Sequence, residues 1–79
     1  MIRIYADFNN TDEDSRVRLD TSGSREDIER SSNELVEGTR VMLYMIDEFE
    51  VEGTLVFDKI WRAIPDWGTI RYTPPTTEP

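Results

Sequence analysis

The chain has 79 residues, enough for one domain with one modest core, and none of them is Cys or His. Without Cys there is no disulfide, and without His the commonest general base and metal ligand are missing, so we expect no enzyme, cofactor or metal centre. The 17 acidic and 9 basic side chains give a net charge of −8, which repels phosphate backbones and argues against nucleic acid as a direct ligand.

The first elements read as a hairpin. Residues 2–8 alternate between apolar and polar side chains, the pattern of a half-buried strand. Residues 9–15 form a polar, acidic loop, and residues 16–20 alternate again with Val17 and Leu19 facing inward. This second alternating run is typical of the return strand of a hairpin.

A short helix is predicted next, over residues 24–31. Ser24 and Asp27 resemble a capping pair. Ile28 is the only large apolar side chain before Leu35, which is little for an amphipathic helix to dock with. The sequence therefore indicates one or two helical turns, and leaves open whether the segment is helical at all.

Residues 39–46 form a strand that is apolar on both faces. One face carries Val41, Leu43 and Met45, and the other carries Met42, Tyr44 and Ile46. Such a strand is central in a sheet or covered by another element. The second face predicts cover either from the helix or from a second copy of the chain, a homodimer through Met42, Tyr44 and Ile46.

The C-terminal half contains further short strands. After a turn at residues 47–48, a strand to residue 58 places Phe49, Val51, Leu55 and Phe57 inward, and Gly53 suggests a bend or a bulge. Residues 60–64 and 69–72 form two more strands, separated by a turn. Residues 73–79 contain three Pro and no core-forming side chain, which indicates a disordered or extended tail.

The element pattern predicts a mainly β domain over residues 1–72, followed by the tail. Five or six short strands and one short helix favour a small SH3-like or OB-like antiparallel barrel. The alternative is an open antiparallel sheet with the helix on one face.

Two acidic segments need partners. The loop 7–14 is rich in oxygen ligands but departs from the EF-hand pattern, so a solvated turn is preferred and a weak cation site stays open. Three Glu alternate over residues 48–52 on one strand face, where they repel one another unless basic side chains pair with them. Arg16 and Arg18, or Arg62 and Arg71, are the predicted partners.

Two short motifs resemble those of SH3 domains. Tyr5-Ala6-Asp7-Phe8 before an acidic loop is similar to their opening Ala-Leu-Tyr-Asp-Phe, and Ile64-Pro65 is similar to their Ile-Pro step. This resemblance implies a small-barrel architecture and carries no binding residues over. Residues 2–72 also resemble short uncharacterised bacterial proteins that begin Ile-Tyr-Ala-Asp-Phe-Asn-Asn, a likeness that implies no function.

The aromatic residues suggest a function. Tyr44, Trp67 and Tyr72 lie near turns and acids such as Asp47 and Asp66, a composition typical of surfaces that bind extended, proline-bearing or cationic peptides. These five residues are the candidate binding site of a non-enzymatic protein-interaction module. The alternative is an acidic inhibitor or antitoxin-like protein that occupies a basic site.

The same sequence bears on location. The longest apolar run, residues 41–46, is too short to cross a bilayer, and the N-terminus has no signal-peptide pattern. We therefore expect a cytoplasmic protein without membrane contact.

Because Trp61 is flanked by alternating apolar residues, it is expected in the core. The tail segment Thr73-Pro74-Pro75 is a candidate to lie across an aromatic groove as polyproline.

Overall fold

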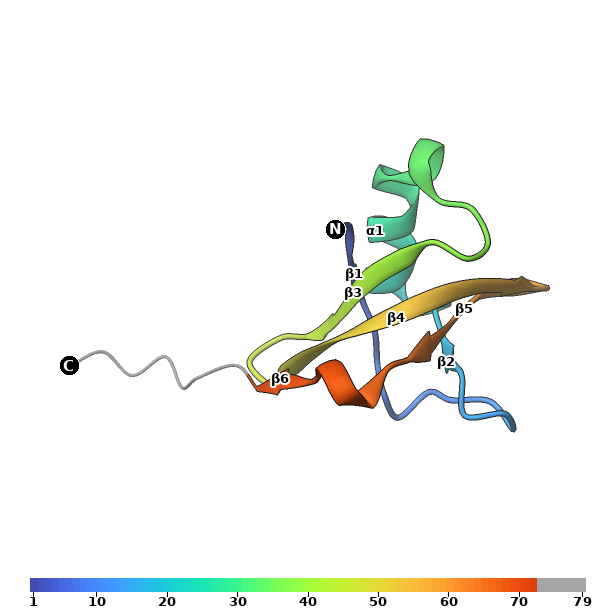
Figure 1. Cartoon of the computed structure of the whole chain (residues 1–79). Helices are drawn as coiled ribbons and strands as arrows, with labels where there is room; N and C mark the ends of the chain where they lie inside the picture. The colour runs from blue at the N-terminus through green and yellow to red at the C-terminus, as the bar shows by residue number, and fades with distance from the viewer. Residues whose placement is uncertain (73–79) are drawn as a thin grey trace.

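The computed structural model describes residues 1–72, and the predicted tail lies outside the described residues. It confirms a mainly β domain with one α-helix (Figure 1). The elements are β1 (Arg3–Tyr5), β2 (Val17–Arg18), α1 (Ser22–Arg30), the 3-10 turn η1 (Ser32–Glu34), β3 (Arg40–Met45), β4 (Phe49–Asp58), β5 (Ile60–Pro65), the 3-10 turn η2 (Trp67–Thr69) and β6 (Arg71–Tyr72). Neither α1 nor the 3-10 turns of residues 1–72 have the length and apolar character that a membrane span requires.

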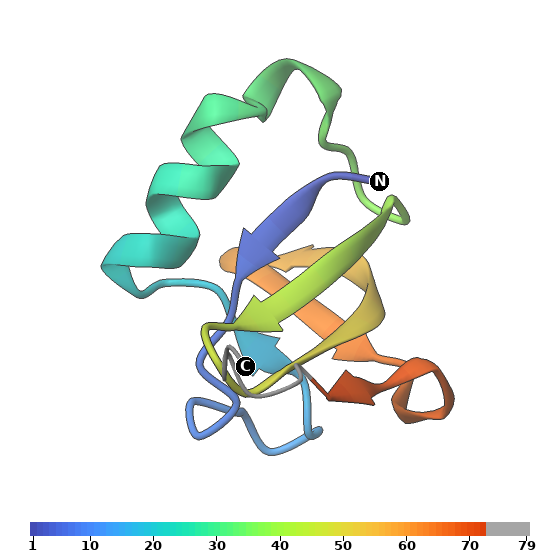
Figure 2. The same cartoon turned by 90° about the vertical axis from the view of Figure 1, so that its left-hand side faces the viewer.

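The six strands form one curled sheet, a half-barrel, in the order β1-β3-β4-β5-β2, with β6 paired to the start of β4 (Figure 2). All pairs are antiparallel except β1 and β3, which run parallel. The predicted hairpin of residues 2–8 with 16–20 is wrong, since β1 pairs with β3 and β2 pairs with β5. The chain pairs with itself there only at an isolated antiparallel bridge between Thr11 and Val17, beside which the Arg18 N–H donates to the Asn10 carbonyl at 2.8 Å.

The core lies inside the curl. Its buried apolar side chains alternate along the strands as expected. They are Ile4, Ala6, Val17, Leu19, Leu35, Val41, Leu43, Val51, Leu55 and Ala63. Trp61 is half-buried against this core. Phe57 is 53% exposed, which corrects its predicted inward position. It lies near the tip of the β4–β5 hairpin, beyond the inward-facing part of the sheet.

Strand β4 runs through Gly53 without a bulge. The registers of β4 with β3 and with β5 both run through Gly53 without an extra residue, so a bulge is excluded. A Cβ at this position would lie 2.7 Å from Leu43 Cδ1 and 3.1 Å from the Ile64 carbonyl oxygen. Glycine is therefore required by close packing between neighbouring strands.

Helix α1 covers the free edge of β1. Its N-cap is Thr21, whose hydroxyl accepts from the Ser24 N–H, so the predicted capping pair is wrong. Ser24 and Asp27 are buried instead and turn toward β1. The Ser24 hydroxyl donates to the Tyr5 carbonyl, and Asp27 Oδ2 accepts from the Tyr5 N–H at 2.9 Å. Two helix side chains thus replace the neighbouring strand that an edge strand lacks.

Candidate functional site

Four aromatic side chains, Phe8, Phe49, Trp67 and Tyr72, meet at one end of the sheet, and we call this cluster the aromatic surface. The ring centroids are 5.0 Å apart for Phe8 and Phe49, 5.4 Å for Phe8 and Trp67, and 6.1 Å for Phe49 with both Trp67 and Tyr72. These tilted and edge-to-face contacts fall in the range in which aromatic pairs attract. The rings come from the loop after β1, from β4, from η2 and from β6, so only folding brings them together.

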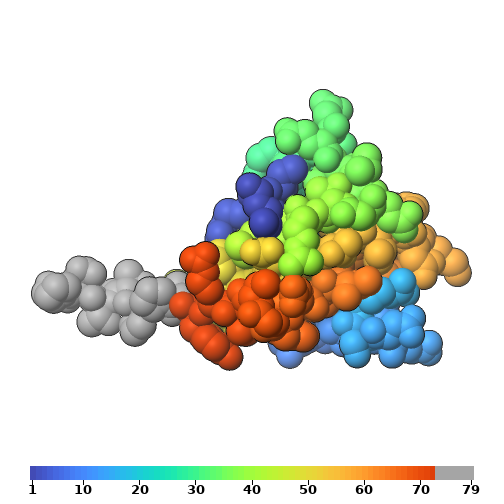
Figure 3. Space-filling view, viewed as in Figure 1, coloured from blue at the N-terminus to red at the C-terminus, as the bar shows by residue number. Residues whose placement is uncertain are grey.

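The exposure of these rings differs. Phe8 and Phe49 are half-buried against the core, whereas Trp67 is 52% and Tyr72 is 73% exposed. Phe49 and Tyr72 stand opposite each other on β4 and β6, which places their rings side by side. Figure 3 shows the η2–β6 segment, in orange to red, on the outside of the molecule. The aromatic surface thus has an anchored base and an open upper layer.

Asp66 holds Trp67 in place. Asp66 Oδ1 accepts from the Gly68 N–H at 3.2 Å and caps η2, while Oδ2 accepts from Arg40 Nη2 at 2.8 Å. The Arg40 guanidinium, with help from the Gly68 N–H, lowers the pKa of Asp66 from its ordinary value. The carboxylate predicted to bind a ligand therefore already has partners, and its role is to position the turn that carries Trp67.

Tyr44 lies away from the aromatic surface. Met45 stands opposite Phe49, so the neighbouring Tyr44 points to the other face of the sheet. Its hydroxyl donates to Asp27 Oδ2 at 2.8 Å, and the Arg3 guanidinium carbon lies 4.6 Å from its ring centroid. The hydrogen bond to Asp27 and burial raise the pKa of Tyr44. The predicted site therefore divides, because Trp67 and Tyr72 come together and Tyr44 does not join them.

The other predicted residues are more dispersed. Asp47 sits exposed in the β3–β4 turn with φ 62°, a left-handed conformation that Asp tolerates. On the face proposed for a homodimer, Met42 is half-buried and Ile46 is 68% exposed. Tyr44 is already covered within the monomer by Arg3 and Asp27. The homodimer stays a prediction, although Tyr44 does not need a second copy of the chain to cover it.

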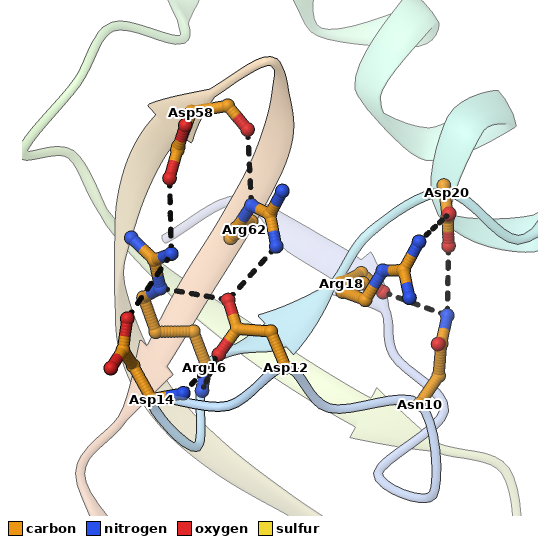
Figure 4. A network of polar contacts seen from close by, with 8 residues as sticks. All are labelled: Asn10, Asp12, Asp14, Arg16, Arg18, Asp20, Asp58 and Arg62. Atoms are coloured by element: carbon orange, nitrogen blue, oxygen red, sulfur yellow. Dashed lines mark hydrogen bonds and ion pairs between the residues drawn. The ribbon is translucent and has the colours of Figure 1, made fainter.

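The acidic loop forms a network of ion pairs (Figure 4). Asp12 accepts from the backbone N–H groups of Asp14 and Arg16, from Arg16 Nε and from Arg62 Nη1, at 2.9 to 3.0 Å. Burial opposes its ionisation, but these hydrogen bonds outweigh that and lower its pKa to about 2. Residues 1–72 contain no group of three acids placed to hold a metal ion. The loop is thus a folded element tied to β5.

The strand acids are also paired, though mostly not by the predicted arginines. Glu50 forms an ion pair with Arg3, and Glu52 with Arg40 at 3.2 Å. Only Arg71, which stands opposite Glu50 on β6, was among the expected neighbours. A cross-strand ladder therefore pairs Glu50 and Glu52, whereas Glu48 lies in the turn before β4 and forms none of the ion pairs within residues 1–72.

Sequence reasoning missed Phe8 and Phe49. Alternation along residues 2–8 and 49–57 predicts inward-facing side chains for both, and both do rest on the core. The alternating pattern gives a side chain's face but not its neighbours at the end of a sheet. Comparisons of the chain with models of known families, with curated proteins and with solved structures gave no match. Function is therefore argued from the site itself.

Proposed function

We propose that the protein is a non-enzymatic protein-interaction module on an SH3-like small β scaffold, and that the aromatic surface is where it binds. One observation carries the proposal: the exposed rings of Trp67 and Tyr72 both pack on the ring of Phe49 and lie outside the core. A core of ten buried apolar residues is complete without them. Contiguous exposed apolar area of this kind is typical of binding sites.

The chemistry of the surface favours a proline-bearing or otherwise apolar extended segment. Large, rigid rings offer flat contact area at little entropic cost, and proline-rich segments are already held in an extended conformation. Asp66, the acid nearest in sequence to Trp67, is paired with Arg40. Binding at this surface should therefore depend on apolar contact and change little with salt.

The test is a pull-down from host-cell lysate with the purified protein as bait, in low and high salt. Trp67→Ala is compared with Phe57→Ala, a matched control because Phe57 is an aromatic residue of almost equal exposure elsewhere. A partner that survives salt, is retained by Phe57→Ala and is lost with Trp67→Ala supports the proposal. The proposal is contradicted if every captured partner is retained by Trp67→Ala.

The acidic inhibitor or antitoxin-like alternative has weaker support. A mimic of nucleic acid does best with an unbroken negative face. In residues 1–72, acids such as Asp12, Asp58 and Asp66 are instead paired with arginines. A basic partner that is released by salt from every variant alike would favour this alternative.

A further inference from the structure

A second apolar surface lies between α1 and the β4–β5 hairpin, far along β4 from the aromatic surface. It is concave, with a volume of about 530 Å³, and its apolar lining is formed by Leu19, Ile28, Phe57, Ile60 and Trp61. We call it the hairpin groove. Cavities of this size are large enough to receive substantial apolar groups of a ligand.

The walls of the hairpin groove are held in position. The Phe57 and Trp61 rings meet edge to face with centroids 5.1 Å apart. The Leu19 N–H donates to the Trp61 carbonyl at 3.0 Å, which ties the segment before α1 to β5. Phe57 nevertheless remains 53% exposed, so its ring contributes more to the groove than to the core.

The rim of the groove is acidic. Asp20, Glu26 and Glu29 stand there with one basic side chain, Arg25. Asp20 already accepts from Asn10 at 2.8 Å. None of the ion pairs formed within residues 1–72 includes Glu26 or Glu29. Being three residues apart on α1, these two carboxylates are neighbours on one helix face.

Two backbone groups beside the groove already have hydrogen-bond partners. The Trp61 carbonyl is used by Leu19, and the Phe57 N–H donates to Glu37 Oε2 at 3.2 Å. Addition of a strand needs free N–H and C=O groups at a sheet edge. The apolar lining of the groove offers side-chain contacts, which suit a segment whose own backbone hydrogen bonds are internal, a helix.

We propose that the hairpin groove binds a basic amphipathic helix of a partner protein. The apolar face of that helix packs over Phe57 and Trp61, and its Lys or Arg side chains contact Glu26 and Glu29. The occupant is chosen by charge complementarity: an apolar groove with two unpaired carboxylates at its rim, on a chain of net charge −8, favours a basic ligand. This binding is independent of the aromatic surface.

The test uses Trp67→Phe protein, in which Trp61 is the only Trp, titrated with a synthetic amphipathic Leu/Lys peptide of about 15 residues. We expect a saturable change in Trp61 fluorescence as the peptide binds. Phe57→Ala should weaken the affinity for the peptide about tenfold. Glu26→Gln with Glu29→Gln should weaken binding several-fold and flatten its salt dependence. Circular dichroism melts confirm that each variant is folded.

Controls separate the groove from general charge attraction. A peptide of the same composition with its amphipathic order scrambled should not bind. Glu13→Gln with Glu34→Gln removes the same charge from exposed sites outside the groove lining and should leave affinity unchanged. The proposal is overturned by an unchanged Trp61 signal, by equal weakening in both double variants, or by light scattering that shows a dimer dissolved by Phe57→Ala. The last outcome would assign the groove to a second copy.

Discussion

Trp67 and Phe57 are almost equally exposed, at 52% and 53%, but they stand in different surroundings. Trp67 belongs to a cluster of four rings whose neighbouring acid, Asp66, is paired with Arg40. Phe57 lines a concave groove with unpaired Glu26 and Glu29 on its rim. Equal exposure thus conceals two kinds of surface, one suited to apolar contact and one to apolar contact combined with charge.

The two surfaces lie toward opposite ends of β4. Phe49 begins the strand and supports the aromatic surface, while Phe57 comes next to its end and lines the hairpin groove. Gly53 lies between them in the close-packed middle of the sheet. Both surfaces therefore depend on the same strand, and variants of β4 and its neighbours can affect them together or one at a time.

The largest effect is expected from Gly53→Val, which should damage both surfaces. The added side chain would collide with Leu43 and with the Ile64 backbone, so we expect a loss of about 3 kcal/mol in unfolding free energy. Urea denaturation measures it. Thr54→Val, at the adjacent half-buried position, is the matched control and should cost much less. Equal losses in the two variants would show that close packing at Gly53 is unimportant.

Asp27→Ala should disturb the hairpin groove and leave the aromatic surface unchanged. It removes the acceptor for the Tyr5 N–H and the Tyr44 hydroxyl, so the docking of α1 should weaken by about 2 kcal/mol. Because α1 lines the hairpin groove but not the aromatic surface, Trp61 fluorescence should change in a Trp67→Phe background. Trp67 fluorescence in a Trp61→Phe background should stay constant. A parallel change in both signals would contradict the separation.

Trp67→Ala should lower stability only modestly. The ring loses contacts with Phe8 and Phe49 but lies largely outside the core, so a loss of about 1 kcal/mol is expected by thermal or urea denaturation. Peptide binding to the hairpin groove should be unaffected, as measured by Trp61 fluorescence. Weaker groove binding in this variant would mean that the two surfaces are coupled.

Acidification should leave the Asp12 network intact over most of the pH range. Because the folded pKa of Asp12 is about 2 and its ordinary value is 3.8, its stabilisation is present above the ordinary value and lost as pH falls toward 2. Asp12→Asn should therefore lower the urea midpoint at pH 7 and have little effect at pH 2. A midpoint difference that is the same at both pH values would exclude this role.

Most strand faces and the main element types could be predicted from local sequence patterns, although Phe57 faces outward against expectation. Alternation placed Ile4, Val17, Leu43 and Leu55 in the core, because side chains of a strand alternate with a period of two whatever its neighbours are. Local sequence signals also predicted the helix, although it begins at Ser22 instead of residue 24. Trp67 and Tyr72 could be selected as candidates because they lie near turns and acids in the sequence, a composition typical of peptide-binding surfaces.

Which strands pair could not be predicted from the residues near them in the chain. Alternation does not name a partner, so the parallel pairing of β1 with β3 could not be read from residues 2–8. Ser24 and Asp27 gained their roles from the edge of β1, which is distant in sequence. Asp12 meets Arg62 across fifty positions for the same reason. Local patterns fix which way a side chain faces, whereas contacts between distant segments depend on how the whole sheet curls.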